Sequence, residues 1–135
     1  ILNMHIQGRD TDLMQLKDIS EKIRKFRDER DWAQFHNPKD MAIAISIEAS
    51  ELLEHFLWKN PEELEARVSA KKDEITDEIA DIGIYLTELA DNLNIDLLAA
   101  MEQKINKNAA KYPAARVKGS SNKYTEYPEG SPESP

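Results

Sequence analysis

Cysteine is absent from the 135-residue sequence, and glycine, proline and histidine are scarce, with 4, 6 and 3 copies. Without cysteine the chain cannot form a disulfide scaffold, a cysteine-ligated zinc site, an iron–sulfur cluster or a thiol nucleophile. Few glycines and prolines leave long stretches without helix breakers, which favours α-helices. No apolar run approaches the roughly 20 residues that a membrane-spanning helix needs. The sequence therefore predicts one all-α domain in the cytoplasm, without a membrane partner.

Basic residues are in the minority. Lys and Arg number 18 against 26 Asp and Glu, so the net charge is −8 and the pI is about 4.9. Such an acidic surface repels the phosphates of nucleic acids, and we expect no nucleic-acid partner. A small polyanionic substrate would need a cation between itself and the protein.

Apolar residues recur three and four positions apart through most of the chain, which is the spacing of one helix face. In one segment, Ile and Leu at positions 75, 79, 82, 86, 89 and 93 form a regular seam, typical of helices that pack in a bundle or across a dimer. Residues 31–40 hold aromatics and a proline, and they predict an ordered loop. The expected helices cover residues 12–30, 41–58, 62–69, 73–94 and 95–112, and they predict a four-helix-bundle-like subunit.

The two ends of the chain differ from this helical domain, which we place at residues 11–113. Residues 1–10 are expected to be a disordered leader. Residues 114–127 are expected to form a basic C-terminal arm, because positions 111–124 carry four basic residues and no acid. Residues 128–135 are expected to be a disordered tail, because nine of the last 17 residues are Gly, Ser or Pro. A basic arm on an acidic domain suggests an anion held between them.

Acidic residues at helical spacing mark the candidate site. Three residues of helix turn a side chain by about 300°, so Glu48 and Glu51 project together, as do Glu78 and Asp81. Glu48 shares its helix face with apolar residues, where an unpaired carboxylate is costly. Mg²⁺ prefers oxygen ligands from carboxylates and substrate phosphates. We therefore expect a Mg²⁺ site where the two helices face each other, with a solvated acidic face as the alternative.

The second acidic pair belongs to a longer stripe on its helix. Its members are Glu74, Glu78, Asp81, Tyr85 and Glu88. No Lys or Arg follows any of these acids by four residues, and like charges at these spacings repel. The stripe therefore also favours a bound cation.

Other metal sites fit the sequence less well. A ferritin-like di-iron bundle needs Glu-x-x-His on two helices, and none of His5, His36 and His55 follows a Glu by three residues. A zinc hydrolase site lacks clustered histidines. For His55 we expect a packing or surface role.

Aromatic side chains could supply flat surfaces on which a nucleobase stacks. They are Trp32, Phe35 and His36 in the loop and Trp58 at a helix end. Ordinary core packing is the alternative for Trp32 and Phe35. Tyr85 continues the acidic stripe, so we expect its ring near the metal. On the last helix, one face carries Lys104, Asn108 and Tyr112, which could offer a cation and an amide.

These residues resemble the MazG-like nucleoside triphosphate pyrophosphohydrolases, all-helical enzymes with the signature E-x-x-E, a spacer and E-x-x-D. Here the signature stands as Glu48-Ala49-Ser50-Glu51 and Glu78-Ile79-Ala80-Asp81, with 26 residues between. Further strings look like the dCTP pyrophosphatase branch: ERDWAQFH at 29–36, FLWK at 56–59, IYL at 84–86, Lys104 with Asn108 before Tyr112-Pro113, and SSNKY at 120–124. The likeness runs from about Asp12 to Tyr127.

The resemblance implies a role for each matching residue. The four signature acids, Glu48, Glu51, Glu78 and Asp81, would hold Mg²⁺. The base would be enclosed by Trp32, His36 and Trp58, while Tyr85 would pack near the sugar and favour deoxyribose. Positions near the base or the phosphates are matched by Lys104, Asn108, Lys123 and Tyr124. The resemblance also implies a homo-oligomer, either a dimer or a tetramer built as a dimer of dimers.

The reaction implied is Mg²⁺-dependent hydrolysis of a dNTP, with dCTP preferred, to the monophosphate and pyrophosphate, which would clean the nucleotide pool. No serine or cysteine nucleophile arrangement is visible, so we expect direct attack by water, oriented by Glu51. Two alternatives stay open. One is a dUTPase-like member of the same superfamily, and the other is a non-catalytic interaction module whose acidic stripe docks a basic partner.

Overall fold

The computed structural model describes residues 14–126, and every regular element among them is helical, which confirms the all-α prediction. The expected leader at residues 1–10 and the expected tail at residues 128–135 lie outside the described residues. The chain divides into two compact units, Ile1–Asn94 and Ile95–Pro135, and each is described by itself. Within residues 14–126, no helix combines the length and the hydrophobicity needed to cross a membrane.

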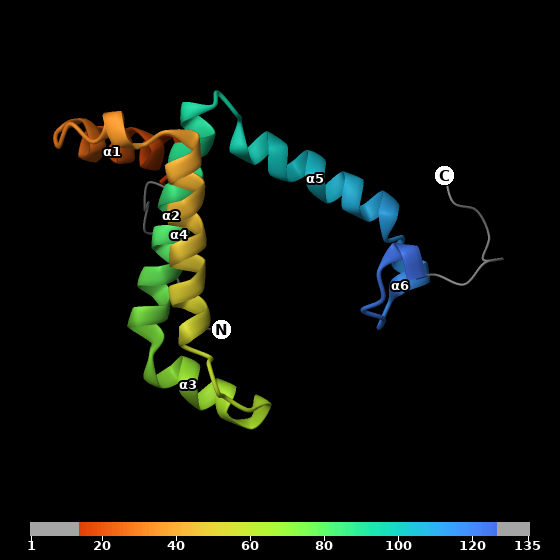
Figure 1. Cartoon of the computed structure of the whole chain (residues 1–135). Helices are drawn as coiled ribbons and strands as arrows, with labels where there is room; N and C mark the ends of the chain where they lie inside the picture. The colour runs from red at the N-terminus through yellow and green to blue at the C-terminus, as the bar shows by residue number, and fades with distance from the viewer. Residues whose placement is uncertain (1–13, 127–135) are drawn as a thin grey trace, which may run out of the picture. The chain divides into compact units, whose positions relative to one another are not determined.

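The first unit is built on two antiparallel helices, α2 (Pro38–Glu54) and α4 (Lys72–Asn92), which pack along each other (Figure 1). Helix α1 (Leu16–Asp28) packs on the C-terminal half of α4, where the Arg24 guanidinium lies 2.9 Å from the Asp91 carboxylate. The connections contain the short elements η1 (Ala33–Phe35), η2 (Pro61–Glu63) and α3 (Leu64–Ala70). This arrangement brings the acids of α2 and α4 opposite each other.

Two Asn-Pro pairs set where helices begin. The Asn37 side chain accepts a hydrogen bond from the Asp40 N–H at 3.0 Å, and Pro38 takes the first helical position, where a missing N–H costs nothing. Helix α2 therefore begins at Pro38, three residues before the predicted start at 41. The pair Asn60-Pro61 opens η2, one residue before the predicted helix start at 62, and the Asn60 N–H donates to the Glu63 carboxylate at 2.8 Å.

Helix α2 ends earlier than predicted. It stops at Glu54, and Trp58 has a φ of 61°, in the left-handed region that a right-handed helix excludes. The prediction of a helix reaching residue 58 was therefore wrong at its C-terminal end. The Trp58 side chain is 89% exposed.

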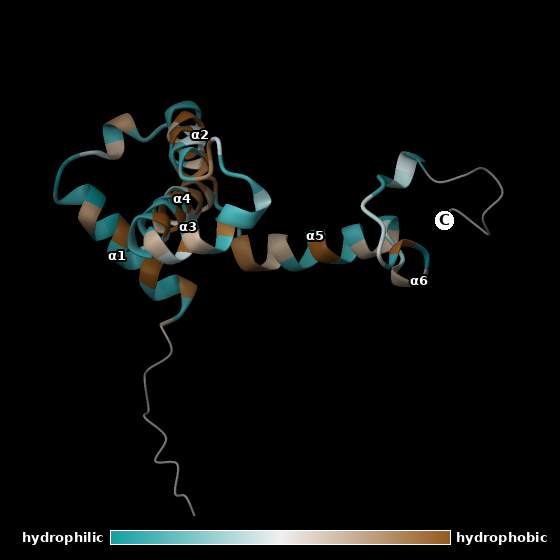
Figure 2. Ribbon diagram, turned by 90° about the horizontal axis from the view of Figure 1, so that it is seen from below, coloured by the Kyte–Doolittle hydropathy of each residue, from teal (hydrophilic) through white to brown (hydrophobic). Residues whose placement is uncertain are grey.

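Few apolar side chains are buried in the first unit. The buried hydrophobic residues among the described part of the chain are Ile23, Met41, Ile75 and Ala90. The predicted seam on α4 divides in two: Ile75, Ile82 and Leu89 are buried or half-buried, whereas Ile79, Leu86 and Leu93 are 42–56% exposed. Hydrophobic residues concentrate along α2 and α4 in Figure 2. One side of the seam therefore packs within the unit, while the other side stays open.

The second unit contains α5 (Leu97–Lys111), α6 (Ala114–Val117) and η3 (Tyr124–Glu126). Asp96 caps α5 by accepting a hydrogen bond from the Ala99 N–H at 3.0 Å. The rings of Tyr112 and Tyr124 meet edge to face with centroids 5.8 Å apart, and the Lys111 Nζ lies 5.2 Å from the Tyr124 ring centre. The basic arm expected at 114–127 thus begins with a short helix that was not predicted, and it folds back on the end of α5.

The four-helix-bundle-like subunit stays a prediction. Helices α1, α2 and α4 pack together in the first unit, and the remaining long helix, α5, belongs to the second unit. Apolar side chains recur along α5, and those of Leu98, Met101 and Ile105 are 53–65% exposed.

Candidate active site

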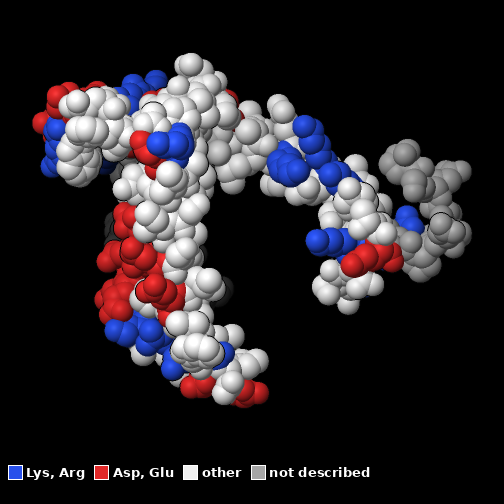
Figure 3. Space-filling view, viewed as in Figure 1, with Lys and Arg blue, Asp and Glu red and all other residues white. Residues whose placement is uncertain are grey.

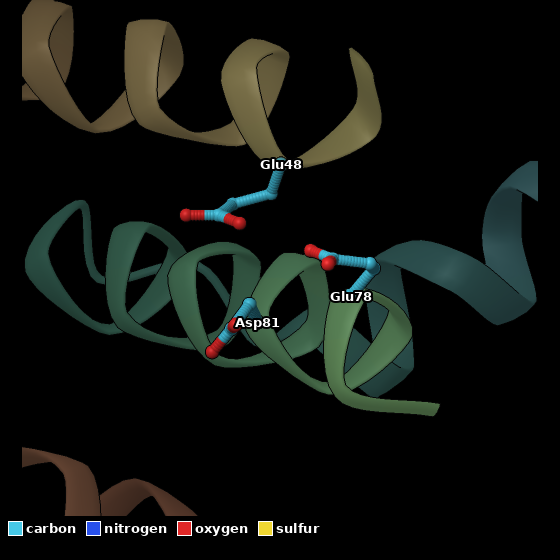
Figure 4. A group of neighbouring side chains, drawn as sticks. All are labelled: Glu48, Glu78 and Asp81. Atoms are coloured by element: carbon cyan, nitrogen blue, oxygen red, sulfur yellow. The ribbon is translucent and has the colours of Figure 1, made fainter. Parts of the chain in front are cut away.

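Three of the four signature acids meet between α2 and α4. Glu48 extends from α2 toward α4, on which Glu78 and Asp81 lie about one turn apart (Figure 4). Each offers one carboxylate oxygen, and these oxygens all lie within 4.8 Å of one another. Glu48 and Glu78 are half-buried and Asp81 is exposed. We call these three residues the carboxylate cluster. Acidic side chains gather along this part of the α2–α4 pair in Figure 3.

The cluster concentrates negative charge. Burial raises the pKa of Glu48, and the neighbouring charges of Glu51, Asp81 and Glu78 raise it further. A bound cation removes this repulsion, and a set made only of carboxylate oxygens suits a hard divalent ion such as Mg²⁺. The residues present therefore fit the metal that the sequence predicted.

Glu51 lies outside the carboxylate cluster. Its side chain is exposed and lines a shallow hollow on the outer face of α2, together with Ile43, Ile47 and Ser50. Its charge still contributes to the raised pKa of Glu48. Glu51 thus stands beside the cluster, where its carboxylate is not one of the three converging groups.

A pocket of about 500 Å³ opens beside the cluster, between α1, the loop before α2, and α4. Its apolar wall consists of Ile19, Ile23, Phe26, Trp32 and Ile84, and its polar residues are Lys22, Arg27, His36, Asp81, Tyr85 and Glu88. We call it the aromatic pocket. Asp81 belongs both to this pocket and to the carboxylate cluster.

Two of the aromatic residues predicted to enclose a base lie in this pocket. The Trp32 ring meets the Phe26 ring edge to face at 5.8 Å between centroids, and its centroid lies 6.3 Å from that of the His36 ring. Trp58 does not line the pocket. Phe35 is 60% exposed and does not line the pocket either. Its side chain therefore neither belongs to this pocket nor packs in the core.

Tyr85 lines the pocket next to Asp81, as its place on the acidic stripe predicted. Burial raises the pKa of the Tyr85 phenol, and the charges of Glu48, Asp81 and Glu88 raise it further. The hydroxyl therefore stays protonated at physiological pH, as a hydrogen-bond donor on a residue that lines the pocket.

Glu88, the last acid of the stripe, was not singled out from the sequence. It is 3% exposed, its Oε1 lies 2.7 Å from the His36 Nδ1, and the Arg27 Nη1 lies 3.5 Å from the same oxygen. Arg27 also donates to the Asn92 side chain at 3.1 Å. Glu88 is therefore paired with Arg27 of α1 and hydrogen-bonded to His36 of the loop. The spacing of residues within α4 could not predict these two partners.

Other acids of the stripe also have partners from outside it. The Lys71 Nζ lies 2.8 Å from the Glu74 carboxylate. The His55 Nε2 lies 3.9 Å from the Glu78 Oε1, and the His55 side chain is 13% exposed. His55 thus packs against the edge of the carboxylate cluster, in agreement with the packing role expected for it.

The remaining predicted site residues belong to the second unit. Lys104 and Asn108 lie four residues apart on α5, and both are exposed. Tyr124 packs on Tyr112, while Lys123 donates its backbone N–H to the Glu126 carboxylate at 2.9 Å. Their roles at the site stay predictions.

Comparisons with known proteins agree with the signature motif. A family model described as the MazG-like family matches residues 43–127. The chain therefore belongs to the MazG-like family, which confirms the resemblance seen in the sequence.

Within that family, the chain is similar to dCTP pyrophosphatase 1. The Homo sapiens protein of that name is 38% identical over 117 residues, which cover 85% of this chain and 69% of that protein. The Rattus norvegicus protein is 37% identical over the same length. A crystal structure of a pyrophosphatase from Archaeoglobus fulgidus matches with a TM-score of 0.71 and 40% identity, covering 73% of this chain and 92% of that one. The predicted enzyme class, a nucleoside triphosphate pyrophosphohydrolase, agrees with these names.

Proposed function

We propose that this protein hydrolyses a deoxynucleoside triphosphate to the monophosphate and pyrophosphate, with Mg²⁺ as cofactor and dCTP as the preferred substrate. The observation that carries the proposal is the position of Asp81, which joins the carboxylate cluster to the aromatic pocket. A pocket of about 500 Å³ with one apolar wall suits a nucleoside. One ligand can therefore place its base against Trp32 and its phosphates toward the carboxylates.

In this proposal the signature acids hold the metal. Glu48, Glu78 and Asp81 supply converging oxygens, and Glu51, which lies outside the cluster in this structure, would join them as the fourth ligand by turning its side chain inward from α2. When bound, Mg²⁺ supplies a Lewis acid that polarises a phosphoryl oxygen and neutralises developing charge. These carboxylates would hold the ion between α2 and α4.

Water is the proposed nucleophile. It attacks the α-phosphorus and releases a proton to a nearby carboxylate or to solvent, the bond from that phosphorus to the α,β-bridging oxygen breaks, and pyrophosphate leaves. Glu51 is proposed to orient this water, because its exposed carboxylate stands beside the cluster and can accept a hydrogen bond from it. If Glu51→Gln kept both Mg²⁺ binding and normal turnover, this role would be wrong.

Base recognition is assigned to the loop before α2. Trp32 would offer its ring for stacking, His36 would offer a polar ring edge, and Tyr85, which lines the same pocket, would lie near the sugar. Trp58 is proposed as a further base contact from outside the pocket lining. Alanine at Trp58, and at Lys104, Asn108, Lys123 and Tyr124, tests the roles that the resemblance assigns to them.

A homo-oligomer, either a dimer or a tetramer, is also proposed. The open side of the α4 seam and Ile43, Ile47 and Leu53 of α2 expose apolar side chains, which a second copy would cover. Sedimentation analysis should give a multiple of the 15.5 kDa chain mass. Leu86→Asp should shift that mass to the monomer.

Product analysis tests the function. The protein is incubated with each common dNTP and its ribonucleotide counterpart, with Mg²⁺ and with a chelator. We expect monophosphate and pyrophosphate, fastest from dCTP, with loss of activity in chelator and in Glu48→Ala. The variant should keep its helical circular dichroism, because removing one of several like charges relieves repulsion.

Other products would change the assignment. Release of inorganic phosphate would indicate a different phosphohydrolase, and preferential use of dUTP would indicate a dUTPase-like enzyme. No turnover with any nucleotide and no stabilisation by Mg²⁺ would favour the interaction module.

A further inference from the structure

The starting point is the buried carboxylate of Glu88, which the proposed chemistry does not use. At 3% exposure it is the most buried acid in the described part of the chain, and it is not a member of the carboxylate cluster. Arg27, with 13% of its side chain exposed, lies 3.5 Å away and compensates its charge. A buried, compensated carboxylate held between two elements is a fixed hydrogen-bond acceptor.

The Glu88 carboxylate determines which ring nitrogen of His36 carries a proton. A carboxylate paired with the Arg27 guanidinium serves as an acceptor, so the 2.7 Å contact between the Glu88 Oε1 and the His36 Nδ1 favours a proton on Nδ1. In the neutral imidazole the other nitrogen, Nε2, is then an acceptor with a lone pair. No residue of the described range 14–126 is hydrogen-bonded to Nε2, and both His36 and Glu88 line the aromatic pocket.

We infer that Glu88 is a positioning and specificity-determining residue, which holds His36 in the Nδ1–H tautomer so that Nε2 accepts a hydrogen bond from a nucleobase amino group. Among pyrimidines this selects the 4-amino base, cytosine, over the 4-keto bases. A keto oxygen would face the lone pair of Nε2, and two acceptors left unpaired in a pocket cost about tenfold or more in affinity. The inference rests on the proposed nucleotide site, and it identifies the two residues, Glu88 and His36, that select the base.

The tautomer is measured directly in the protein without nucleotide. A long-range ¹H–¹⁵N correlation spectrum at mildly alkaline pH distinguishes protonated from unprotonated ring nitrogens, and the chain has only three histidines to assign. The signal missing in His36→Gln identifies the residue. We expect protonated Nδ1 and unprotonated Nε2. The opposite tautomer, or a ring with both nitrogens protonated, would overturn the inference.

The selectivity is measured by binding, so that it does not depend on turnover. The probes are dCTP and dUTP analogues with NH in place of the α,β-bridging oxygen, titrated calorimetrically with Mg²⁺. We expect the wild-type protein to bind the cytosine analogue at least about tenfold more tightly. Glu88→Gln, whose amide can donate to Nδ1 and so reverse the tautomer, should lose most of this preference and show a changed His36 spectrum.

Two further variants keep the inference falsifiable. Glu88→Asp retains an acceptor-only carboxylate and should restore part of the preference that Glu88→Gln loses. Glu21→Gln makes the same chemical change at an exposed acid of α1 and should leave the preference and the spectrum unchanged. If Glu88→Gln does not fold, two wild-type measurements still test the inference. They are the His36 tautomer and the ratio of the affinities for the dCTP and dUTP analogues.

The outcomes separate this inference from the proposed function. Selective binding of the cytosine analogue without hydrolysis of dCTP would refute the proposed reaction and support the inference. Hydrolysis of dCTP together with equal binding of the two analogues, or with a preference that Glu88→Gln retains, would refute the inference alone.

Discussion

Replacing Glu48 with glutamine tests whether the carboxylate cluster is a metal site. The oxygens of Glu48, Glu78 and Asp81 lie within 4.8 Å of one another. Two like charges at this separation repel by about 1 kcal/mol in water and about 3 kcal/mol at an effective dielectric constant near 20. Solvent reaches this cluster, so we take about 1 kcal/mol as the repulsion that the substitution relieves. The metal-free variant should therefore unfold about 3–6 °C above the wild type.

The effect should depend on pH in one direction. Burial first, and then the neighbouring carboxylates, raises the pKa of Glu48, so the folded chain holds this proton more tightly than the unfolded chain. The cost of ionising Glu48 therefore grows as pH rises from the ordinary glutamate pKa through the raised value, and it is fully present above that value. The gain from Glu48→Gln should be complete above the raised pKa and vanish below the ordinary glutamate pKa.

Magnesium should reverse the ranking of the two proteins. A ligand that binds only the folded state at a hundredfold excess over its Kd stabilises that state by about 2.7 kcal/mol. Glutamine removes one anionic ligand, so most of this stabilisation should disappear. Thermal unfolding followed by far-UV circular dichroism, with chelator or with Mg²⁺, measures both effects. Glu21→Gln is the matched control, and it should change neither.

Two results would refute this reasoning. One is a metal-free Glu48→Gln protein that is less stable than the wild type at neutral pH. The other is equal stabilisation of both proteins by Mg²⁺, which would mean that the ion binds elsewhere or that Glu48 is not a ligand.

Further perturbations probe the neighbouring groups. Because burial raises the pKa of Tyr85, Tyr85→Phe should remove a phenol transition that lies above the ordinary tyrosine pKa in a spectrophotometric titration, and survival of that transition would contradict the assignment. Arg27→Met leaves the buried Glu88 carboxylate without its guanidinium and should lower the free energy of unfolding in urea by about 3 kcal/mol, whereas no change would show that the pair is not coupled. In Trp58→Phe, the remaining tryptophan is Trp32, and the dCTP analogue should quench its fluorescence; unchanged emission would count against stacking in the aromatic pocket.

The helices and the cluster were predictable because both depend on local spacing. A helical period places Glu48 on the inner face of α2 and sets Glu78 and Asp81 about one turn apart on α4. The relative directions of side chains on one helix depend on the geometry of that helix alone, and not on the elements that pack against it. The predicted helix ends were less accurate. Pro38 was assigned to a loop because Asn37 was not recognised as the N-cap of α2.

Relations between elements were not predictable from spacing. The partner of Glu88 on α1 lies 61 positions earlier in the chain, and the His36 contact spans 52 positions. Within its own helix, Glu88 looked like one more repelling acid of the stripe. Only the packing of α1 and the loop against α4 shows that this acid is compensated.

The backbone at Trp58 has a consequence for protein engineering. A bulky residue held at a φ of 61° costs of order 1–3 kcal/mol, and its 89% exposed ring recovers little of that cost through packing. Glycine or asparagine would relax this turn, so a redesign guided by thermal stability alone would replace the tryptophan early. If Trp58 contacts the nucleotide as proposed, such a stabilised protein would be a poorer enzyme, and thermostability screens of this chain should carry an activity measurement beside them.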